Sequence, residues 1–244
     1  MTEPITESII EPIIKKERKK RIQQILKKYY NENENVLEIG IDEAGRGPML
    51  GRVYSGAVIL PKDDSFNHTL MKDSKRFHSK KKIQEAADYI KNNAIAWSVG
   101  YCDENVIDKI NIRVATHRAM HKAIRETINK MKGNQNKQYQ LLVDGNDFNP
   151  FMELKDDIGL VQIPHKCIEG GDNKYTAIAA ASILAKVERD AYIKAICIED
   201  PTLDEHYGLL RNNGYGTKIH LDGIKTHGIS KYHRKTFGIC QHYA

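Results

Sequence analysis

The chain has 244 residues, of which 40% are hydrophobic and 29% charged, which is enough for one sizeable domain with an appendage. Its 38 lysines and arginines outnumber its 32 aspartates and glutamates, and a net charge of +6 permits a polyanionic partner such as nucleic acid without requiring one. Four widely separated cysteines argue against a zinc ribbon or a disulfide framework, and no apolar run approaches the roughly 20 residues of a membrane span.

Residues 1–34 differ in composition from the rest of the chain. Behind a basic block at 15–21, apolar residues recur at helical spacing: Ile22, Ile25, Leu26, Tyr29 and Tyr30. This pattern predicts an amphipathic helix with a basic face, followed by an asparagine-rich linker at 31–35. A nucleic-acid arm, a nuclear-import patch and an ordinary solvated face all fit it. The first residues lack the apolar core of a signal peptide, so we expect an intracellular protein.

Hydrophobic periodicity predicts the elements of the remaining chain. The expected strands are 36–41, 53–60, 94–101, 139–143 and 160–163. The expected helices are 79–90 with Ser79 as N-cap, 111–132 ended by Gly133, and the alanine-rich 174–198. The first two strands are close enough in the chain to form an antiparallel hairpin. This order predicts an α/β fold, in which a mixed sheet carries helices on both faces and a tail of short helical pieces follows.

Acidic residues stand at comparable positions in this scheme. Asp42 and Glu43 end the first strand, Asp144 ends the fourth, and Asp172 precedes the alanine-rich helix behind two glycines. Because ligand sites of α/β sheets gather at strand ends, these carboxylates are candidates for one metal site. Oxygen ligands without cysteine or histidine favour Mg²⁺ or Mn²⁺, and two such ions about 4 Å apart could clamp a phosphodiester. For each acid alone, an ordinary turn with a solvated carboxylate is the alternative.

Several other motifs fail on their spacing. The loop 45–51 is not a dinucleotide-binding loop, because Leu50 stands where the third glycine is needed. The chain has neither a GxxxxGK[ST] phosphate loop nor a GxSxG nucleophile elbow. His117 and His121 lie four residues apart without the glutamate of an H-E-x-x-H zinc motif, so we expect them on a polar helix face.

The stretch Asp42-Glu43-Ala44-Gly45-Arg46-Gly47-Pro48 resembles the signature of the type 2 ribonucleases H, in particular ribonuclease HII. The resemblance continues through blocks in family order, from about residue 36 to 238: Asp73-Ser74-Lys75, Val143-Asp144-Gly145, Gly171-Asp172 running into IAAASILAK, Arg189-Asp190, Gly214-Tyr215-Gly216-Thr217 with His220, and His233-Arg234-Lys235-Thr236-Phe237. Only the N-terminal extension lies outside these blocks.

The resemblance implies a ribonuclease H-like catalytic domain at 35–244, with a helical C-terminal substrate-binding part, after an extension at 1–34. It implies a two-metal endonuclease for RNA/DNA hybrids and for ribonucleotides embedded in DNA, cutting 5′ of the ribonucleotide to leave 3′-hydroxyl and 5′-phosphate ends. By the same resemblance the metal-binding catalytic acids are Asp42, Glu43, Asp144 and Asp172. A hybrid-binding module and a ribonuclease H-like nuclease for branched DNA are the alternatives.

The resemblance also implies which residues contact the substrate. Gly45, Arg46 and Gly47 would read the ribose 2′-hydroxyl, which distinguishes RNA from DNA, and Tyr215 would stack on the following sugar. Glycines beside Arg46 let the backbone approach closely because no Cβ intervenes. We expect phosphate contacts from three lysines: Lys75, Lys186 and Lys218.

Departures from the family pattern do not touch the acids. Gly170 stands where lysine is commoner, and Lys235-Thr236 replaces a smaller polar residue before Phe237. Arg46 with Pro48 argues against the ribonuclease HIII branch, and the blocks are closer to single-chain enzymes than to the catalytic subunit of the eukaryotic heterotrimer. We expect a monomer, and the sequence carries no signal for or against a sliding-clamp partner.

Overall fold

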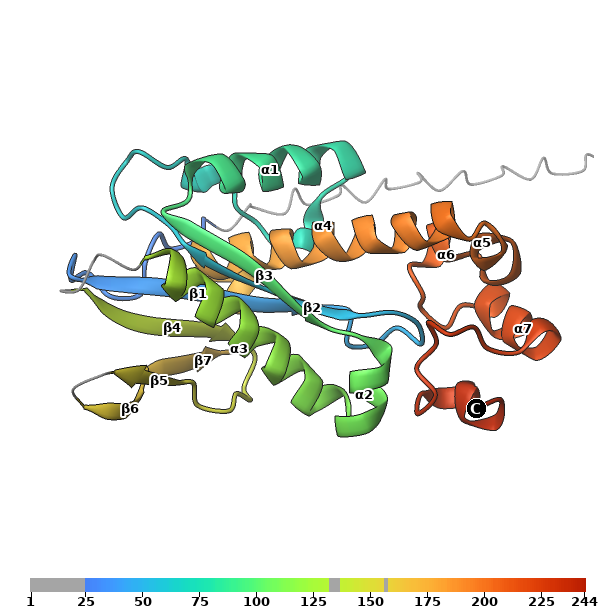
Figure 1. The fold of residues 1–244 in the computed structure, drawn as a ribbon. Helices are drawn as coiled ribbons and strands as arrows, with labels where there is room; N and C mark the ends of the chain where they lie inside the picture. Colours follow the sequence, from blue (N-terminus) through green and yellow to red (C-terminus); the bar gives the residue numbers. More distant parts are fainter. Residues whose placement is uncertain (1–24, 132–136, 156–157) are drawn as a thin grey trace, which may run out of the picture.

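The computed structural model describes residues 25–131, 137–155 and 158–244 (Figure 1). A five-stranded mixed sheet lies at its centre, in the order β3-β2-β1-β4-β7. These strands are β1 (Val36–Ala44), β2 (Val53–Ile59), β3 (Ala96–Cys102), β4 (Gln138–Asp144) and β7 (His165–Ile168). β2 pairs antiparallel with both β1 and β3, whereas β4 lies parallel to β1 and to β7. The predicted hairpin and the mixed sheet are therefore confirmed.

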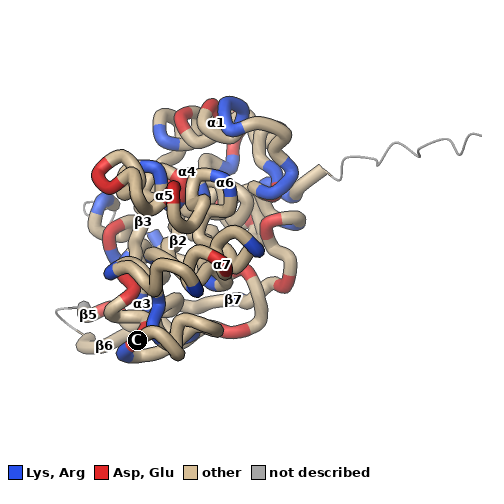
Figure 2. The backbone as a smooth tube through the Cα atoms, turned by 90° about the vertical axis from the view of Figure 1, so that its right-hand side faces the viewer, with Lys and Arg blue, Asp and Glu red and all other residues tan. Residues whose placement is uncertain are grey.

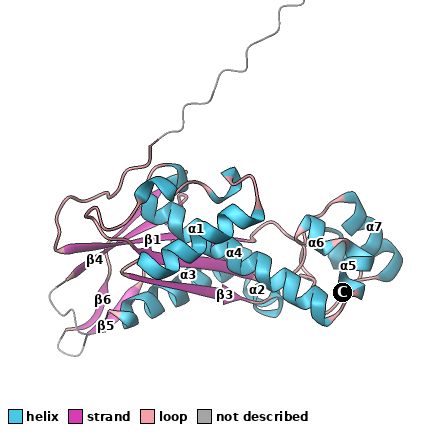
Figure 3. Ribbon diagram, turned by 90° about the horizontal axis from the view of Figure 1, so that it is seen from above, coloured by secondary structure: helices cyan, strands magenta, loops and turns pink. Residues whose placement is uncertain are grey.

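Helices cover both faces of the sheet. α1 (Lys80–Asn93) and α4 (Thr176–Glu199) pack on one face, and α3 (Ile112–Lys130) packs on the other (Figures 1 and 3). The predicted N-cap is present, because the Ser79 side chain accepts a hydrogen bond from the N–H of Lys82. The layers expected from the sequence are thus confirmed.

Small residues let α4 lie directly on the sheet. A Cβ on Gly40 of β1 would come within 2.1 Å of the carbonyl carbon of Ala177, and one on Gly56 of β2 within 2.4 Å of the oxygen of Ala181. Neither glycine could gain a side chain without moving the helix. This close packing places the start of α4 beside the ends of β1 and β4.

Short helices form the C-terminal part, beyond the end of β1 (Figure 1). They are α5 (Thr202–Tyr207), α6 (Leu209–Asn212) and α7 (Lys218–His227). Their apolar side chains form one cluster with the last turns of α4 and with Met49 and Leu50: Ile193, Ile196, Leu203, Tyr207, Leu209 and Ile224. The cluster ties this part of the chain to the loop after β1.

Two predicted elements differ from the structure. The predicted strand 160–163 corresponds to β6 (Gly159–Gln162), which pairs with β5 (Met152–Lys155) in a sheet separate from the main one. The main sheet takes β7 as its fifth strand, and this short run containing His165 and Lys166 gave no apolar signal. The predicted long helix begins as expected at Asn111, its N-cap, but a separate helix α2 (Glu104–Ile110) precedes it. It ends at Lys130, and Gly133 lies outside the described residues.

The histidine pair on α3 does not form a polar face. His117 is only 4% exposed, and its ring packs edge-on against Phe148, 6.1 Å away between centroids. His121 packs against the same ring at 5.3 Å. The prediction was wrong because Phe148, which follows β4, folds back over this side of α3, a long-range contact that local periodicity does not reveal.

The expected N-terminal helix lies largely outside the described residues. From residue 25 to 35 the chain is not helical, and Lys27 instead forms a parallel bridge with Tyr175 at the start of α4. The buried Glu38 carboxylate accepts the N–H of Tyr30 at 2.9 Å. The helical prediction is wrong for this part, because main-chain pairing with the domain competes with helix formation.

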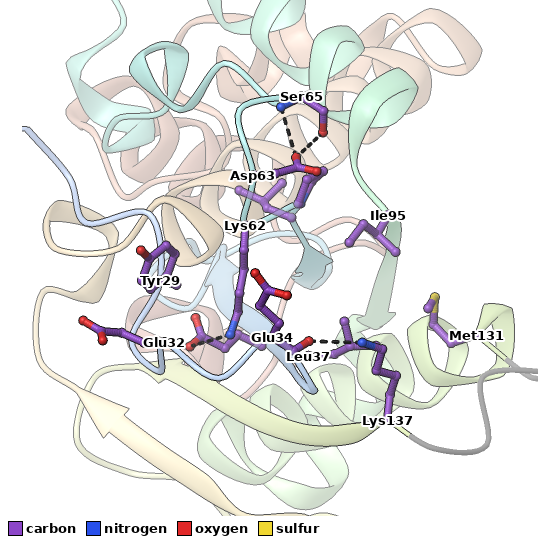
Figure 4. Close-up of a pocket in the computed structure, with 13 residues that line it drawn as sticks. Tyr29, Glu32, Glu34, Leu37, Lys62, Asp63, Ser65, Ile95, Met131 and Lys137 are labelled. Carbon is purple, nitrogen blue, oxygen red and sulfur yellow. Dashed lines mark hydrogen bonds and ion pairs between the residues drawn. The ribbon is translucent and has the colours of Figure 1, made fainter.

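The same segment borders a pocket of about 560 Å³ at the start of β1 (Figure 4). Lys62 donates to the carbonyl oxygens of Asn31 and Asn33 at 2.6 and 2.8 Å. Lys137 donates to the carbonyl of Glu34 at 3.1 Å, as Figure 4 shows. Both lysines therefore hold the main chain of residues 31–34 in place.

Over the described residues, no helix combines the length and apolarity needed to cross a bilayer.

Candidate active site

The parallel pairing of β1 and β4 brings two of the acids to one edge of the sheet. Ile41 pairs with Val143, so Asp42 and Asp144 follow at neighbouring strand positions. Asp172 lies in the 3₁₀ turn Gly171–Asn173 that leads into α4. The N–H of Gly171 donates to Asp144 Oδ1 at 2.6 Å, which ties this turn to the end of β4.

All residues of the predicted site except Lys218 line one pocket of about 300 Å³. They are Asp42, Glu43, Asp144, Asp172, Gly45, Arg46, Gly47, Lys75, Lys186 and Tyr215. Lys218 lies exposed at the first position of α7 and is not among the lining residues. The convergence expected from strand-end positions is therefore present, although the pocket itself does not assign a role to any residue.

Burial and mutual repulsion raise the pKa values of Asp42, Glu43 and Asp172. Asp42 is 5% exposed, and desolvation followed by the charges of Glu43 and Asp144 raises the pKa of its carboxyl well above the ordinary value. Desolvation also raises the pKa of Glu43, against the opposing effect of Arg46, whose Nη1 lies 3.3 Å from Glu43 Oε1. Burial and the charge of Asp144 raise the pKa of Asp172. A bound cation would relieve this repulsion.

The donor chemistry of the pocket fits a hard divalent cation, because its acidic groups offer only carboxylate oxygens. Within the described ranges, no three carboxylate, histidine or cysteine side chains are already arranged as a ligand set. Asp42 Oδ1 accepts the N–H of Glu43 at 2.7 Å, and Asp172 Oδ1 accepts the side-chain amide of Asn173 at 3.0 Å. The acids therefore face protein donors, and holding an ion would require them to turn toward one another.

The two predicted lysines at the pocket differ in their surroundings. Lys186 Nζ lies 2.7 Å from an oxygen of Asp190, one turn further along α4, so its charge is already paired. Lys75 is exposed and follows the N-cap Asp73, whose carboxylate accepts its N–H at 2.8 Å. Lys75 is therefore the freer of the two to meet a phosphate.

The loop after β1 and the ring of Tyr215 are neighbours at the edge of the pocket. Gly45 has a φ of +96°, which side chains other than glycine rarely adopt, and a Cβ there would lie 2.3 Å from Arg189 Nε. Both the backbone conformation and the available space therefore require glycine. A Cβ on Gly47 would lie 3.4 Å from Cε1 of Tyr215, an ordinary contact. Tyr215 is 50% exposed, which leaves its ring available to a ligand.

Five further residues line the pocket without having been assigned a role from the sequence: Ala44, Ser74, Ser182, Arg189 and Asp190. Ser182 Oγ lies 3.0 Å from Ser74 Oγ, which joins α4 to the Asp73-Ser74-Lys75 block. Arg189 is 3% exposed and donates to the carbonyl of Asn213 at 2.8 Å. No local pattern reveals a buried arginine, since arginine is usually a surface residue.

Charge alone would not locate this site. Figure 2 looks onto the end of the molecule that carries α5, α6 and α7, and there basic and acidic segments alternate. The chain's excess of lysine and arginine is therefore not gathered into one face in this view.

Comparison with known proteins gives one consistent result. The family model for ribonuclease HII matches residues 39–240. A ribonuclease HII of Parabacteroides distasonis is 44% identical over 201 residues, which cover 82% of this chain and 89% of that protein. A ribonuclease HII of Bacteroides fragilis is 43% identical over 208 residues, covering 85% and 92%.

Solved structures agree at the level of the fold. The ribonuclease H2 of Pyrococcus horikoshii superposes with a TM-score of 0.60 at 18% identity, over 84% of this chain and 96% of that one. Bst-RNase HIII in complex with Mn²⁺ superposes with a TM-score of 0.54 at 17% identity, over 80% and 63%. The chain therefore belongs to the ribonuclease HII family, metal-dependent endoribonucleases that act on RNA/DNA hybrids and on ribonucleotides embedded in DNA.

Proposed function

We propose that this pocket cleaves the phosphodiester on the 5′ side of a ribonucleotide within a DNA duplex or an RNA/DNA hybrid, leaving a 3′-hydroxyl and a 5′-phosphate. One observation carries the proposal: the four acids share a single pocket with the Gly45–Gly47 loop and Tyr215. A site for hydrolysis and a site for sugar recognition therefore meet within one substrate-sized space. The scissile phosphate would lie on the acids while the sugar beside it lies against the loop.

In this proposal Asp42, Glu43, Asp144 and Asp172 hold two Mg²⁺ or Mn²⁺ ions. Such ions would supply Lewis-acid activation of the phosphodiester and neutralise developing charge. The raised pKa values of Asp42, Glu43 and Asp172 support this role, because bound cations would offset the cost of placing these charges together. The Mn²⁺ complex of the ribonuclease HIII relative supports a divalent ion, although that likeness extends only to the fold.

The Gly45–Gly47 loop would select the sugar. Its glycines bring main-chain groups to the pocket surface, where they can hydrogen-bond a 2′-hydroxyl as donor or acceptor. Tyr215 would stack on the next sugar with its exposed ring. Lys75 has no ion-pair partner among the described residues and would contact a phosphate directly. Lys186 would have to share its charge with Asp190.

We further propose that 35–244 is the catalytic domain and that 1–34 is an extension that strengthens binding of the polyanionic substrate. The basic block at 15–21 supports this role through sequence-independent attraction to phosphates. Deleting residues 1–24 removes the basic block and keeps the residues that are bonded to the domain, such as Lys27 and Tyr30. This deletion should weaken hybrid binding and reduce its salt dependence without moving the cleavage position. A truncated chain with unchanged affinity at low and high salt would leave the extension without this role.

The central test is nicking of a duplex DNA that holds one ribonucleotide, with Mg²⁺ or Mn²⁺ present. The expected result is a single cut 5′ of the ribonucleotide, no cut in an all-DNA duplex, and loss of cleavage in EDTA. An intact single-ribonucleotide substrate with both metals would refute the proposal. Binding without cleavage would instead indicate a hybrid-binding module, and cleavage of the all-DNA duplex would indicate a nuclease of broader specificity.

A further inference from the structure

The fully buried Arg234 organises the loop that borders the pocket. Its Nη2 donates to the carbonyl of Gly45 at 2.6 Å, and its Nη1 to those of Arg46 at 3.0 Å and Pro48 at 2.7 Å. Its Nε donates to the carbonyl of Gly51 at 2.8 Å. In the described structure all hydrogen bonds of this guanidinium go to main-chain oxygens of one loop. The planar fork thereby fixes four points of a turn that local sequence would leave free.

His233, the residue before Arg234, is connected to Tyr215 through another histidine, His220. The N–H of Ser230 donates to His233 Nδ1 at 2.9 Å, so this nitrogen accepts and the proton of the neutral ring lies on Nε2. His233 Nε2 lies 3.0 Å from His220 Nε2 and therefore donates to it. His220 then carries its proton on Nδ1 and donates to the carbonyl of Tyr215 at 3.0 Å. The chain of bonds runs in one direction and ends at Tyr215.

Both histidines are buried, at 0% exposure for His220 and 1% for His233. Main-chain bonds complete the connection between the two sides: Met49 donates to the carbonyl of Gly214 at 2.8 Å, and Arg234 donates its own N–H to the carbonyl of Met49 at 2.9 Å. Two consecutive residues thus hold the two groups from outside the pocket: Arg234 holds the loop, and His233, through His220, holds Tyr215.

The geometry points to a role in sugar selection. We propose that His233, acting through His220, and Arg234 are positioning residues that set where the Gly45–Gly47 loop and the Tyr215 ring stand relative to each other at the edge of the pocket. This inference rests on the proposed function, because the relative placement of loop and ring matters only if a sugar binds against both. Neither residue lines the pocket, so they act on the substrate only through the groups they hold.

The relative placement of loop and ring decides which sugar can bind against both. A Cβ added at Gly47 would lie 3.4 Å from Tyr215 Cε1, so the two groups are immediate neighbours and a sugar would touch both at once. Since a hydrogen bond weakens steeply with added distance or misalignment, a small outward shift of either group would forfeit the bond to a 2′-hydroxyl. Phosphate contacts tolerate such a shift better, because they act through charge.

The test measures ribose preference in binding. The full chain carrying Asp144→Asn, which we expect to be unable to cut, is titrated with Mg²⁺ present against two duplexes that differ by one 2′-hydroxyl. The readout is the ratio of the two Kd values by fluorescence anisotropy. If this parent shows no ribose preference, the proposed function fails rather than the positioning role. If it cleaves, the assignment of Asp144 fails.

A matched pair at His220 separates positioning from folding. His220→Leu removes the donor to Tyr215, and we expect the ratio to fall about fivefold, the scale of one lost hydrogen bond. His220→Asn offers a side-chain amide near the position of Nδ1 and should keep the ratio within about twofold of the parent. Both variants lose the bond to His233, so their thermal unfolding should be similar. Equal loss of preference in both, or loss in neither, would overturn the proposal for the histidines.

Arg234→Lys tests the loop side, since three donors on one nitrogen cannot reach four carbonyls arranged around a fork. The expected loss of ribose preference is about tenfold, with affinity for the all-DNA duplex within about threefold of the parent. A wild-type ratio in this variant would overturn the role of Arg234. His227→Leu, an exposed histidine on α7 outside the chain of bonds, serves as the control and should leave the ratio unchanged.

Discussion

The N–H of Gly171 donates to Asp144 Oδ1 at 2.6 Å, so the turn that carries Asp172 is held by a carboxylate at the end of β4. Asp144 therefore has two separable properties, an acceptor oxygen and a negative charge. The acceptor maintains the geometry of the loop, whereas the charge is what a divalent cation would require. Substitutions that remove one property and keep the other can distinguish these contributions.

Asp144→Asn keeps an oxygen that can accept from Gly171 and loses the charge. We expect cleavage to fall below about a thousandth of wild type, because the substitution removes a proposed metal ligand. Substrate affinity should stay within a few-fold of wild type, because the substitution removes little contact with phosphate. Single-turnover nicking and anisotropy measure the two quantities. Asp144→Ala, which also frees the Gly171 turn, should unfold at a lower temperature than Asp144→Asn. Undiminished turnover by the asparagine variant would show that this acid is not catalytic.

Asp42→Asn should stabilise the metal-free protein. The raised folded-state pKa means that ionising this carboxyl near neutral pH costs folding free energy, and a neutral amide avoids that cost. A gain of about 1 kcal/mol corresponds to roughly 2–4 °C in Tm for a chain of this size. Scanning calorimetry in EDTA at pH 7.5 measures it, with the exposed Glu126→Gln as the control. A lower Tm for Asp42→Asn would argue against repulsion among the acids.

The order of layers could be predicted from local pattern, because each element carries its own periodicity and cap. Ser79, the alanines of α4 and the apolar run before Asp42 signal their structures within a few residues. β7 could not be predicted, because His165 and Lys166 interrupt the pattern and the strand is defined by its partner β4. The same holds for the extended chain at Lys27, which depends on a bridge to Tyr175.

Asp42, Glu43, Asp144 and Asp172 were predictable as one group, because ligand sites of α/β sheets gather where the strands end. The groups behind the pocket were not. Arg234 and His233 make their bonds to carbonyls and rings far away in the sequence, and such contacts have no periodicity. Lys218 shows the converse case, since a conspicuous lysine beside the Tyr215 block lies outside the pocket. Side-chain chemistry can be read locally, but what a side chain faces is set by tertiary contacts.

Two glycines of the sugar loop should respond differently to an added methyl group. At Gly47 the new Cβ makes an ordinary 3.4 Å contact with Tyr215, so Gly47→Ala should fold normally and place a methyl group on the surface where the sugar would bind. We expect kcat/KM for a single-ribonucleotide duplex to fall about tenfold or more with Tm unchanged within about 2 °C. Gly45→Ala meets Arg189 at 2.3 Å from a φ of +96° and should instead lower Tm by several degrees. Equal effects of both variants on Tm would contradict this difference.

The buried histidine pair should make stability fall with acidity. Burial and the neighbouring His220 lower the pKa of His233 to about 3, whereas an unfolded histidine titrates near 6.5. Between about pH 3 and 6.5 the unfolded chain binds a proton at His233 and the folded chain does not. The contribution of the neutral His233 to folding stability is therefore complete above about pH 6.5 and is lost as pH falls toward 3.

His233→Gln isolates this effect, because the acids of the pocket, whose raised pKa values act in the opposite direction, remain in both proteins. The difference in unfolding free energy between wild type and variant should shrink by about 1 kcal/mol or more from pH 7 to pH 5, given up to about 1.4 kcal/mol per pH unit for one proton. Urea unfolding at pH 7, 6 and 5 measures it. A difference that does not change with pH would mean that the His233 ring is not held neutral against His220.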